Sequence, residues 1–272
     1  MSDQYAVMGN PIAHSKSPNI HRLFAEQTQQ DIEYNALLVD IDDFPHAVGE
    51  FSAAGGKGLN ITVPFKQNAW DLCSEHSQRA QRAGAVNTII INSPGDYHGD
   101  NTDGIGLVHD LKNNSIQITN KKLLLLGAGG AARGIIEPLL QENPTLLHIA
   151  NRTESKAHAL AELFSDLGNI KGSGFDVLAG KSFDLIINAT AASLEGKIPS
   201  LPDNILATSG NCYDLMYAKK PTAFVQWGIQ HGATQSIDGL GMLVEQAAES
   251  FYLWRGVRPD TMTVIQALKS KN

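Results

Sequence analysis

The chain has 272 residues, 42% of them hydrophobic, and a formal net charge of −7. This length indicates either one large α/β unit or two domains, each able to bury a hydrophobic core. The acidic balance excludes the broad basic surface that nucleic-acid binding needs, so no nucleic-acid partner is expected.

Two cysteines, Cys73 and Cys212, are too far apart for a CxxC metal or redox motif, which favours reduced, partly buried thiols and a reducing compartment. The N-terminal residues do not resemble a secretory signal, because no basic stretch leads into an apolar core. The longest apolar run, residues 123–132, is too short to span a bilayer. We therefore expect a soluble, cytoplasmic protein with no membrane partner, either a monomer or a homodimer.

Short β-rich runs alternate with helical patterns along the chain, which predicts βαβ units and parallel sheets with ligands at the carboxyl ends of the strands. The expected strands are residues 5–8, 58–63, 85–91, 123–126, 147–150 and 185–189. The expected helices are residues 18–27, 66–76, 131–141 and 153–164.

The strongest local motif follows a run of four leucines and reads Gly127, Ala128, Gly129, Gly130, Ala131 and Ala132. It fits G-x-G-x-x-A at a strand-to-helix turn, where backbone N–H groups reach a pyrophosphate at the helix N-terminus. A glycine turn without a ligand is the alternative. The order of strand, turn and helix favours a dinucleotide site.

The end of the next strand discriminates between the two nicotinamide dinucleotides. An acidic residue there would bind the ribose of NAD, but this chain has Asn151, Arg152 and Thr153, with Lys156 one helical turn later. The guanidinium suits a 2′-phosphate, so we expect NADP. Glu154 is the competing observation, although an acidic residue in a first helical turn also complements the helix dipole. Thr153 or Asn151 could equally cap the helix.

Polar residues occur after strands in the first hundred residues, and each has a structural alternative. Ser17 could cap a helix that has Pro18 at its first position, which leaves Ser15 unexplained. Lys66 could be an ordinary exposed lysine. Asn87 and Thr88 could face solvent on an edge strand. Thr102 or Asp103 could simply cap the helix that follows.

Taken together, these segments resemble the shikimate dehydrogenase family in order and over essentially the whole chain. The matching blocks are GNPIAHSKSP, GGKGLNITVPFK, AGAVNT, GDNTDGIG, GAGGAARG, NRT, CYDLMY and DGLGMLVEQA. The resemblance implies an α/β fold of two domains, a substrate-binding domain with a mainly parallel sheet and a Rossmann-type NADP-binding domain. Residues 1–103 with 239–272 would form the first, and residues 104–238 the second.

The resemblance also implies site residues. Lys66 is expected to be the proton shuttle, with Asp103 as its orienting partner. The expected substrate contacts are Ser15, Ser17, Asn60, Thr62, Asn87, Tyr217 and Gln246. The expected cofactor contacts are Gly127, Ala128, Gly129, Gly130, Ala131, Asn151, Arg152, Thr153, Lys156, Ala189, Thr190, Leu215 and Gly239.

Three positions depart from the family pattern. Ala191 follows Thr190 where many members have serine, Lys156 replaces an arginine, and Gln78 replaces a residue that is often acidic. Lysine keeps the charge but loses the bidentate fork, which weakens discrimination of the 2′-phosphate. Lys66 and Asp103 are unaffected.

The residues and the resemblance together predict NADPH-dependent reduction of 3-dehydroshikimate to shikimate, in the pathway to chorismate and the aromatic amino acids. No metal is expected, because the nine histidines form no ligand motif. In the C-terminal helix, Gln246 lies away from the apolar stripe and is free to face a ligand. The alternatives are an NAD-preferring quinate/shikimate dehydrogenase, a non-catalytic NADP-binding regulator and a methyltransferase with an acidic ribose ligand.

Overall fold

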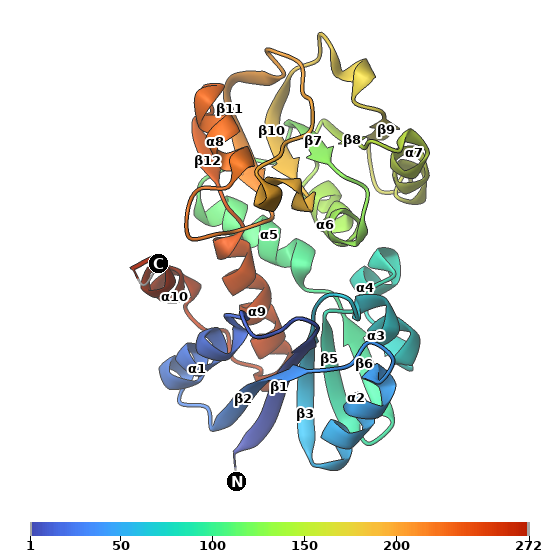
Figure 1. Cartoon of the computed structure of the whole chain (residues 1–272), viewed down its shortest axis with the longest axis vertical. Coiled ribbons are helices and arrows are strands. Elements are labelled where there is room, and N and C mark those ends of the chain that lie inside the picture. Colours follow the sequence, from blue (N-terminus) through green and yellow to red (C-terminus); the bar gives the residue numbers. More distant parts are fainter. Residues whose placement is uncertain (1, 271–272) are drawn as a thin grey trace. The chain divides into compact units, whose positions relative to one another are not determined.

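The computed structural model describes residues 2–270 and divides into two compact units. The first unit contains the residues up to Gly106 together with those from Leu243 onward, and the second is Leu107–Met242. The boundaries fall inside two helices, α5 (Asp103–Asn113) and α9 (Leu240–Arg255) (Figure 1). The first unit is therefore assembled from two separate stretches of sequence.

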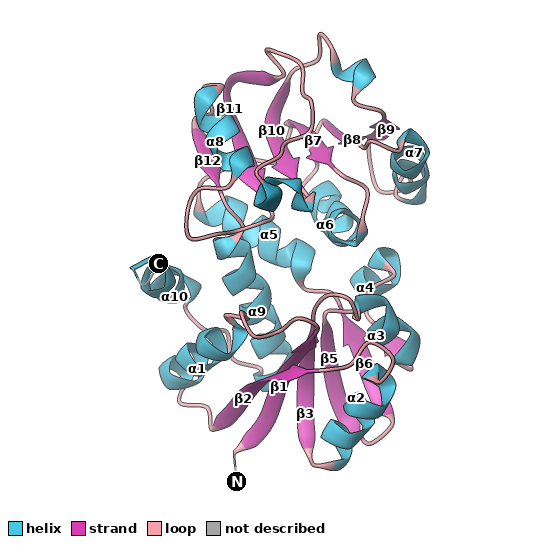
Figure 2. Cartoon of the chain, viewed as in Figure 1, coloured by secondary structure: helices cyan, strands magenta, loops and turns pink. Residues whose placement is uncertain are grey.

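The first unit is built on a six-stranded sheet with the strand order β2-β1-β3-β5-β6-β4 (Figure 2). The strands are β1 (Asp3–Gly9), β2 (Ile32–Leu38), β3 (Gly56–Ile61), β4 (Glu75–His76), β5 (Thr88–Ser93) and β6 (Asp96–Asp100). β1, β2 and β3 are parallel, whereas β5 is antiparallel to both β3 and β6. Gly95, with φ +85°, provides the left-handed conformation that reverses the chain between β5 and β6.

Helices cover both faces of this sheet because its central strands are apolar on both sides. The helices are α1 (Ser17–Thr28), α2 (Phe44–Ala53), α3 (Lys66–Leu72), α4 (Gln78–Ala83) and α10 (Thr261–Ser270), together with most of α9. In β1, Tyr5 and Val7 join one buried cluster, and Ala6 and Met8 join another. This alternation is the two-residue period of a strand.

The second unit is a parallel six-stranded sheet with the order β12-β11-β10-β7-β8-β9. Its strands are β7 (Lys122–Leu126), β8 (Leu146–Ala150), β9 (Ile170–Ser173), β10 (Phe183–Asn188), β11 (Leu206–Asp214) and β12 (Gln235–Ile237). Its helices are α6 (Gly130–Gln141), α7 (Glu154–Leu163), α8 (Ala223–Gln230), most of α5 and the 3₁₀ segments Asp176–Leu178 and Ala191–Glu195. This is the doubly wound order of a dinucleotide-binding fold, so the expected α/β and Rossmann architecture is confirmed.

The four leucines of β7 show why this sheet is covered on both faces. Leu123 and Leu125 pack with residues of α5, α6 and α7, whereas Leu124 and Leu126 pack with residues of α8. All four side chains are fully buried. A continuous apolar run is typical of a central strand in a parallel sheet, because neither face meets water.

Three local expectations were wrong. The helix that begins at Lys66 ends at Leu72, because Cys73 is extended and His76 pairs in β4 with β6. Asn87 and Thr88 do not lie at an edge: β5 runs between β3 and β6, and both side chains are buried. Ser17 is the first residue of α1 rather than its cap, a position taken by Lys16 without a side-chain capping bond.

Both cysteines are free and buried, and burial raises the pKa of each thiol to about 12. Within residues 2–270, no helix combines the length and the apolar character needed to cross a bilayer.

Candidate functional site

Lys66 and Asp103 form an ion pair in the first unit. The Lys66 Nζ lies 2.5 Å from Oδ2 of Asp103, and the side chains are 30% and 13% exposed. Lys66 begins α3 and Asp103 begins α5, so each is placed directly after a loop that leaves the sheet. The pair is partly sheltered while the lysine stays accessible to a ligand.

Asn87 holds the carboxylate of this pair from the other side. Its Nδ2 donates to Oδ1 of Asp103 at 2.8 Å, and its Oδ1 accepts from the backbone N–H of Thr102 at 2.9 Å. The Thr102 hydroxyl donates to the same oxygen at 3.1 Å. Because Asn87 is 2% exposed, its amide cannot exchange these partners for water. The orientation of Asp103 is therefore fixed from two directions.

Gln246 joins the same cluster from α9. Its Oε1 accepts from Asn87 Nδ2 and from the Thr102 hydroxyl, each at 3.4 Å, and its own amide donates to the Leu243 carbonyl at 2.8 Å. One turn further along the helix, the buried Ser250 hydroxyl lies 2.8 Å from that of Thr88. The polar face of α9 thus lies against the start of β5, next to Asn87.

Asn60 is committed to internal hydrogen bonds. Its Oδ1 accepts from the Tyr34 hydroxyl at 2.7 Å, and its Nδ2 donates to Ser250 at 2.9 Å and to Thr88 at 3.2 Å. Tyr34 is also hydrogen-bonded to Ser17, and burial raises its pKa well above 10. This chain of contacts connects the start of α1 with Asn60 on β3 and Thr88 on β5.

Ser15 and Thr62 lie in the loops that follow β1 and β3, and both are half-buried. The Ser15 hydroxyl accepts from the backbone N–H of Ser17 at 3.3 Å. Thr62 lies against Gly9, where a Cβ would come within 2.4 Å of its methyl group. The eight expected residues of the first unit therefore lie near strand ends, in the loops that follow strands or on the helices beside them.

A buried ion-pair network supports the loop that carries Asp103. Asp100, at the end of β6, accepts from Arg79 Nε at 2.6 Å and Nη2 at 2.9 Å, and from the backbone N–H of Asn101 at 2.6 Å. Arg79 also donates to Glu249 at 3.0 Å. The motifs gave no indication of this pairing, because α4 and α9 are far apart in the sequence.

The expected cofactor residues follow one row of the second sheet. Ala150, Leu126, Asn188 and Asp214 are in register across β8, β7, β10 and β11. The residues directly after this row are Asn151, Gly127, Ala189 and Leu215. Four expected cofactor positions therefore share the carboxyl edge of the sheet, where doubly wound folds bind nucleotides.

The turn after β7 has the form of a phosphate cradle. Gly127 has φ +107°, which a residue with a side chain rarely adopts. Cβ atoms at Gly129 and Gly130 would meet nothing within 4 Å, and the N-terminus of α6 has no side-chain cap. Ala128 is half-buried and Ala131 exposed. The free N–H groups and open space fit a bound pyrophosphate.

The segment after β8 offers donors to a phosphate. Arg152, Thr153 and Lys156 are exposed, and Arg152 makes no ion pair within the described chain. The Asn151 side chain donates to the Thr153 carbonyl at 2.9 Å, which fixes the bend before α7. Thr153 occupies the cap position without a side-chain bond, so its hydroxyl remains available. This donor set fits the 2′-phosphate of NADP.

Two further expected residues lie beside the strand row. A Cβ at Gly239 would lie 2.3 Å from the Leu215 carbonyl oxygen, so only glycine fits this close approach. Tyr217 belongs to the second unit, is half-buried, and has a pKa raised by burial and by the charge of Asp238. The other expected substrate contacts belong to the first unit.

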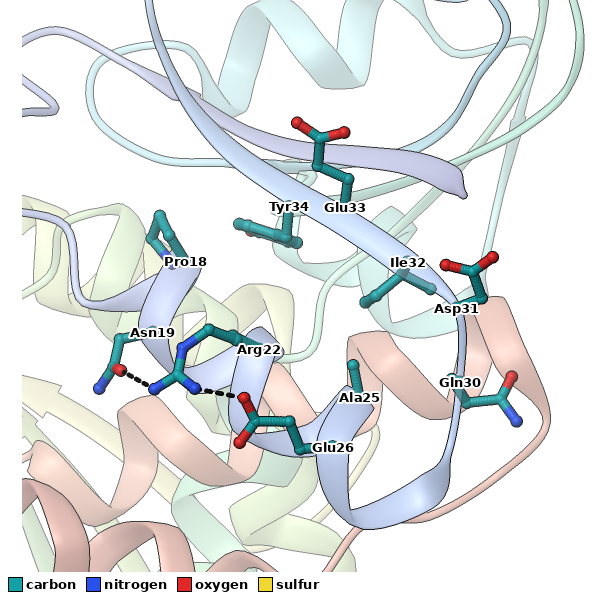
Figure 3. A pocket seen from close by; sticks show the side chains of 10 residues that line it. All are labelled: Pro18, Asn19, Arg22, Ala25, Glu26, Gln30, Asp31, Ile32, Glu33 and Tyr34. Carbon is teal, nitrogen blue, oxygen red and sulfur yellow. Dashed lines mark hydrogen bonds and ion pairs between the residues drawn. The ribbon is translucent and has the colours of Figure 1, made fainter. Parts of the chain in front are cut away.

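A separate hollow of about 650 Å³ lies between α1 and β2 (Figure 3). Its polar lining includes Arg22, whose guanidinium donates to Asn19 Oδ1 at 3.0 Å and to the Glu26 carboxylate one turn later in the helix. None of the expected site residues lines it, so this hollow is not the candidate site.

Three family models match the chain. They are the shikimate dehydrogenase substrate binding domain over residues 7–89, shikimate / quinate 5-dehydrogenase over residues 110–195, and the shikimate 5'-dehydrogenase C-terminal domain over residues 239–269. The shikimate dehydrogenase (NADP(+)) of Cellvibrio japonicus is 56% identical over 269 residues, which cover 99% of this chain and 98% of the relative.

The chain belongs to the shikimate dehydrogenase family.

Solved structures of similar fold agree. The Ael1 enzyme from Pseudomonas putida has a TM-score of 0.92 at 45% identity, with 98% of each chain covered. Shikimate 5-dehydrogenase from Thermus thermophilus, in complex with NADP(H) and shikimate, has a TM-score of 0.87 at 32% identity and covers 97% of this chain and 98% of that chain. The expected enzyme class, an NADP-dependent shikimate dehydrogenase, is confirmed at the level of the family.

Proposed function

We propose that this chain catalyses the reversible reduction of 3-dehydroshikimate to shikimate with NADPH, with Lys66 as the proton shuttle. The observation that carries the proposal is the 2.5 Å contact between Lys66 Nζ and Asp103 Oδ2, with Asn87 on the second carboxylate oxygen. Such a pair can hold a proton donor in one position beside a ligand.

NADP, when bound, carries the hydride that is exchanged with the substrate carbon. In the direction of reduction, the Lys66 ammonium donates one proton to the carbonyl oxygen and is reprotonated from solvent. In the direction of oxidation, the neutral amine accepts the hydroxyl proton. Asp103 stabilises the ammonium and keeps Nζ in place, because its own orientation is fixed by Asn87.

The remaining residues of the first unit bind the ring and its carboxylate. Ser15 and Ser17 supply hydroxyl donors for the carboxylate, and Thr62 and Gln246 face the ring hydroxyls. Asn87 is 2% exposed and already bonded to Asp103 and Thr102, so its proposed task is to orient Asp103 rather than to contact the ring. Several short-range polar groups suit a polyhydroxylated acid. Tyr217 is proposed as a further contact from the second unit.

Asn60 has a different proposed task from direct contact. Its amide is 6% exposed and its oxygen and nitrogen both have internal partners, so it connects β3 with Thr88 at the start of β5. A buried amide satisfied in this way stabilises its neighbours rather than a ligand.

In the second unit, the backbone N–H groups of residues 127–131 bind the pyrophosphate, and Asn151, Arg152, Thr153 and Lys156 bind the 2′-phosphate. Ala189, Thr190, Leu215 and Gly239 lie beside the nicotinamide half of the cofactor. The support for this assignment is the common carboxyl edge that positions these segments.

The test is an assay of the purified chain with shikimate or quinate, each with NADP⁺ or NAD⁺, in which the absorbance of reduced nicotinamide is followed. We expect turnover with shikimate and NADP⁺ to exceed the other three combinations. Preference for quinate with NAD⁺ would favour the alternative dehydrogenase, and no turnover in any combination would contradict the enzymatic proposal.

A further inference from the structure

The carboxylate of Asp214 lies at the end of β11 and is completely buried. It has no cationic partner among residues 2–270 and is surrounded by neutral donors. Oδ1 accepts from Asn188 Nδ2 at 2.9 Å and from the backbone N–H of Met216 at 3.1 Å, while Oδ2 accepts from the Thr222 hydroxyl at 2.6 Å. Burial raises the pKa of this carboxyl, and the hydrogen bonds from its neighbours oppose that rise. A buried acidic group without a counter-ion needs an explanation.

The donors come from two segments beside the cofactor positions, the end of β10 and the loop between β11 and α8. Met216 follows Leu215 in the loop after β11, and Thr222 precedes α8 and caps it through a bond from the Val225 N–H at 3.2 Å. Asn188 ends β10, directly opposite Asp214 in the register. One carboxylate therefore connects the end of β10, the loop after β11 and the start of α8 at the carboxyl edge of the sheet.

Asn188 also fixes the loop that follows β10. Its Oδ1 accepts from the Thr190 backbone N–H at 3.1 Å and from the Thr190 hydroxyl at 2.7 Å. The methyl group of Thr190 lies where a Cβ on Gly127 would come within 3.1 Å. The contact sequence thus runs from Asp214 through Asn188 and Thr190 to the first glycine of the phosphate cradle.

We propose that Asp214 is a positioning residue for the cofactor, which sets the loops of Thr190 and Leu215 against the Gly127 turn before NADP binds. Charge-assisted hydrogen bonds are shorter and stronger than neutral ones, so a carboxylate fixes these loops better than an amide could. The inference rests on the proposed function, because it takes these loops as the cofactor segments. Asp214 itself does not touch the cofactor.

The geometry explains why the isosteric amide would fail. In Asp214→Asn, an NH₂ group in the place of Oδ1 would face two donors, Asn188 Nδ2 and the Met216 N–H. In the place of Oδ2 it would leave the Thr222 hydroxyl proton without its acceptor, because an NH₂ group can only donate. Either orientation loosens at least one loop.

The experiment measures NADP⁺ binding directly by isothermal titration calorimetry, without substrate, for the wild-type chain and for Asp214→Asn, Thr222→Val and Thr222→Ser. We expect the dissociation constant of NADP⁺ to rise about tenfold in Asp214→Asn and by a smaller factor in Thr222→Val. Thr222→Ser keeps the hydroxyl and should restore wild-type binding.

The matched control is Asp184→Asn. It makes the same Asp-to-Asn change on the neighbouring strand β10. Asp184 accepts from the Lys122 backbone N–H and lies at the end of β10 opposite Asn188, away from the cofactor segments. In steady-state assays, the KM for NADP⁺ should rise in Asp214→Asn while the KM for shikimate stays at the wild-type value. If the variant merely contained less folded protein, the apparent kcat would fall and the KM values for NADP⁺ and shikimate would both stay unchanged.

Wild-type binding of NADP⁺ by Asp214→Asn, with Thr222→Val equally unchanged, would overturn this inference and leave the proposed function intact. Failure of the wild-type chain to bind NADP⁺ would contradict the proposed function and with it this inference.

Discussion

The Lys66 Nζ lies 2.5 Å from Asp103 Oδ2, and the second oxygen of that carboxylate accepts from Asn87 at 2.8 Å. The lysine is the more exposed partner, at 30% against 13%. The carboxylate is therefore the fixed partner of the pair, and the ammonium is the partner that stays accessible.

Replacement of this carboxylate is expected to impair turnover more than binding. Asp103→Asn keeps the shape and one acceptor oxygen but removes the charge that holds the ammonium. We expect kcat to fall by about 10²-fold or more, with the NADP⁺ dissociation constant unchanged. Steady-state kinetics measure this change in kcat, with Asp96→Asn, an exposed change on β6, as the control. A kcat of Asp103→Asn within about twofold of wild type would contradict the role of Asp103.

Removal of Arg79 is expected to destabilise the first unit. Arg79→Met leaves the carboxylates of Asp100 and Glu249, which are 4% and 5% exposed, without this cation. The free energy of unfolding should fall by about 3–5 kcal/mol. Urea denaturation provides the measurement.

The matched control for this loss is Arg22→Met. Arg22 makes an exposed pair with Glu26, so its removal should cost no more than about 0.5 kcal/mol. A similar loss of unfolding free energy in both variants would show that the buried ion pairs of Arg79 stabilise the fold no more than an exposed pair does.

Arg152 is expected to set the preference for NADP over NAD. Arg152→Ala should weaken NADP⁺ binding by about 10- to 100-fold and change NAD⁺ binding little, because only NADP carries the 2′-phosphate. Calorimetric titration with both cofactors tests this. The control is Lys122→Ala, at the opposite end of β7, which should leave both affinities unchanged. If Arg152→Ala weakened NAD⁺ binding as much as NADP⁺ binding, Arg152 would not recognise the 2′-phosphate.

His21 is expected to make stability depend on pH. It is fully buried, stacked on Tyr34 at 4.1 Å between ring centroids, and burial lowers its pKa from 6.5 to about 3. Below the unfolded pKa, the unfolded chain binds a proton that the folded chain does not. Stability from this group is thus complete above pH 6.5 and falls by about 1.4 kcal/mol per pH unit as the pH decreases toward the folded pKa.

The measurement compares urea denaturation of the wild type and His21→Phe at about pH 7 and about pH 5. The variant should lose less stability between the two conditions, whereas His158→Gln, an exposed change on α7, should follow the wild type. Equal pH dependence in His21→Phe and the wild type would contradict the assignment. His148, whose pKa burial lowers to about 4, contributes in the same direction in all three proteins.

The sequence predicted the second unit well, because the patterns that define this unit each lie within a short stretch of the chain. The leucine run, the glycine turn and the in-register strand ends all follow from the two-residue period and the turn chemistry around Gly127. The first unit was less predictable. The turn at Gly95 encodes the antiparallel pairing of β5 with β6, but the early end of α3 depends on the pairing of β4 with β6, which no nearby residue encodes.

The same distinction applies to the site. Lys66 and Asp103 were found through motifs, whereas Arg79 meets Glu249 across 170 positions of sequence and gave no signal. Ser250 could have been found, because it lies four residues after Gln246 on the same face of α9. Asp214 lay inside a recognised block but was not singled out, since its importance comes from the register with Asn188.

The central claim is that Lys66 moves the proton. The most direct test is the single-turnover formation of reduced nicotinamide by Lys66→Met with saturating shikimate and NADP⁺, compared with the wild type and with Lys57→Met, an exposed change on β3. The account predicts that both ligands still bind and that the rate falls by about 10²- to 10⁴-fold only in Lys66→Met. A wild-type rate in Lys66→Met would contradict it.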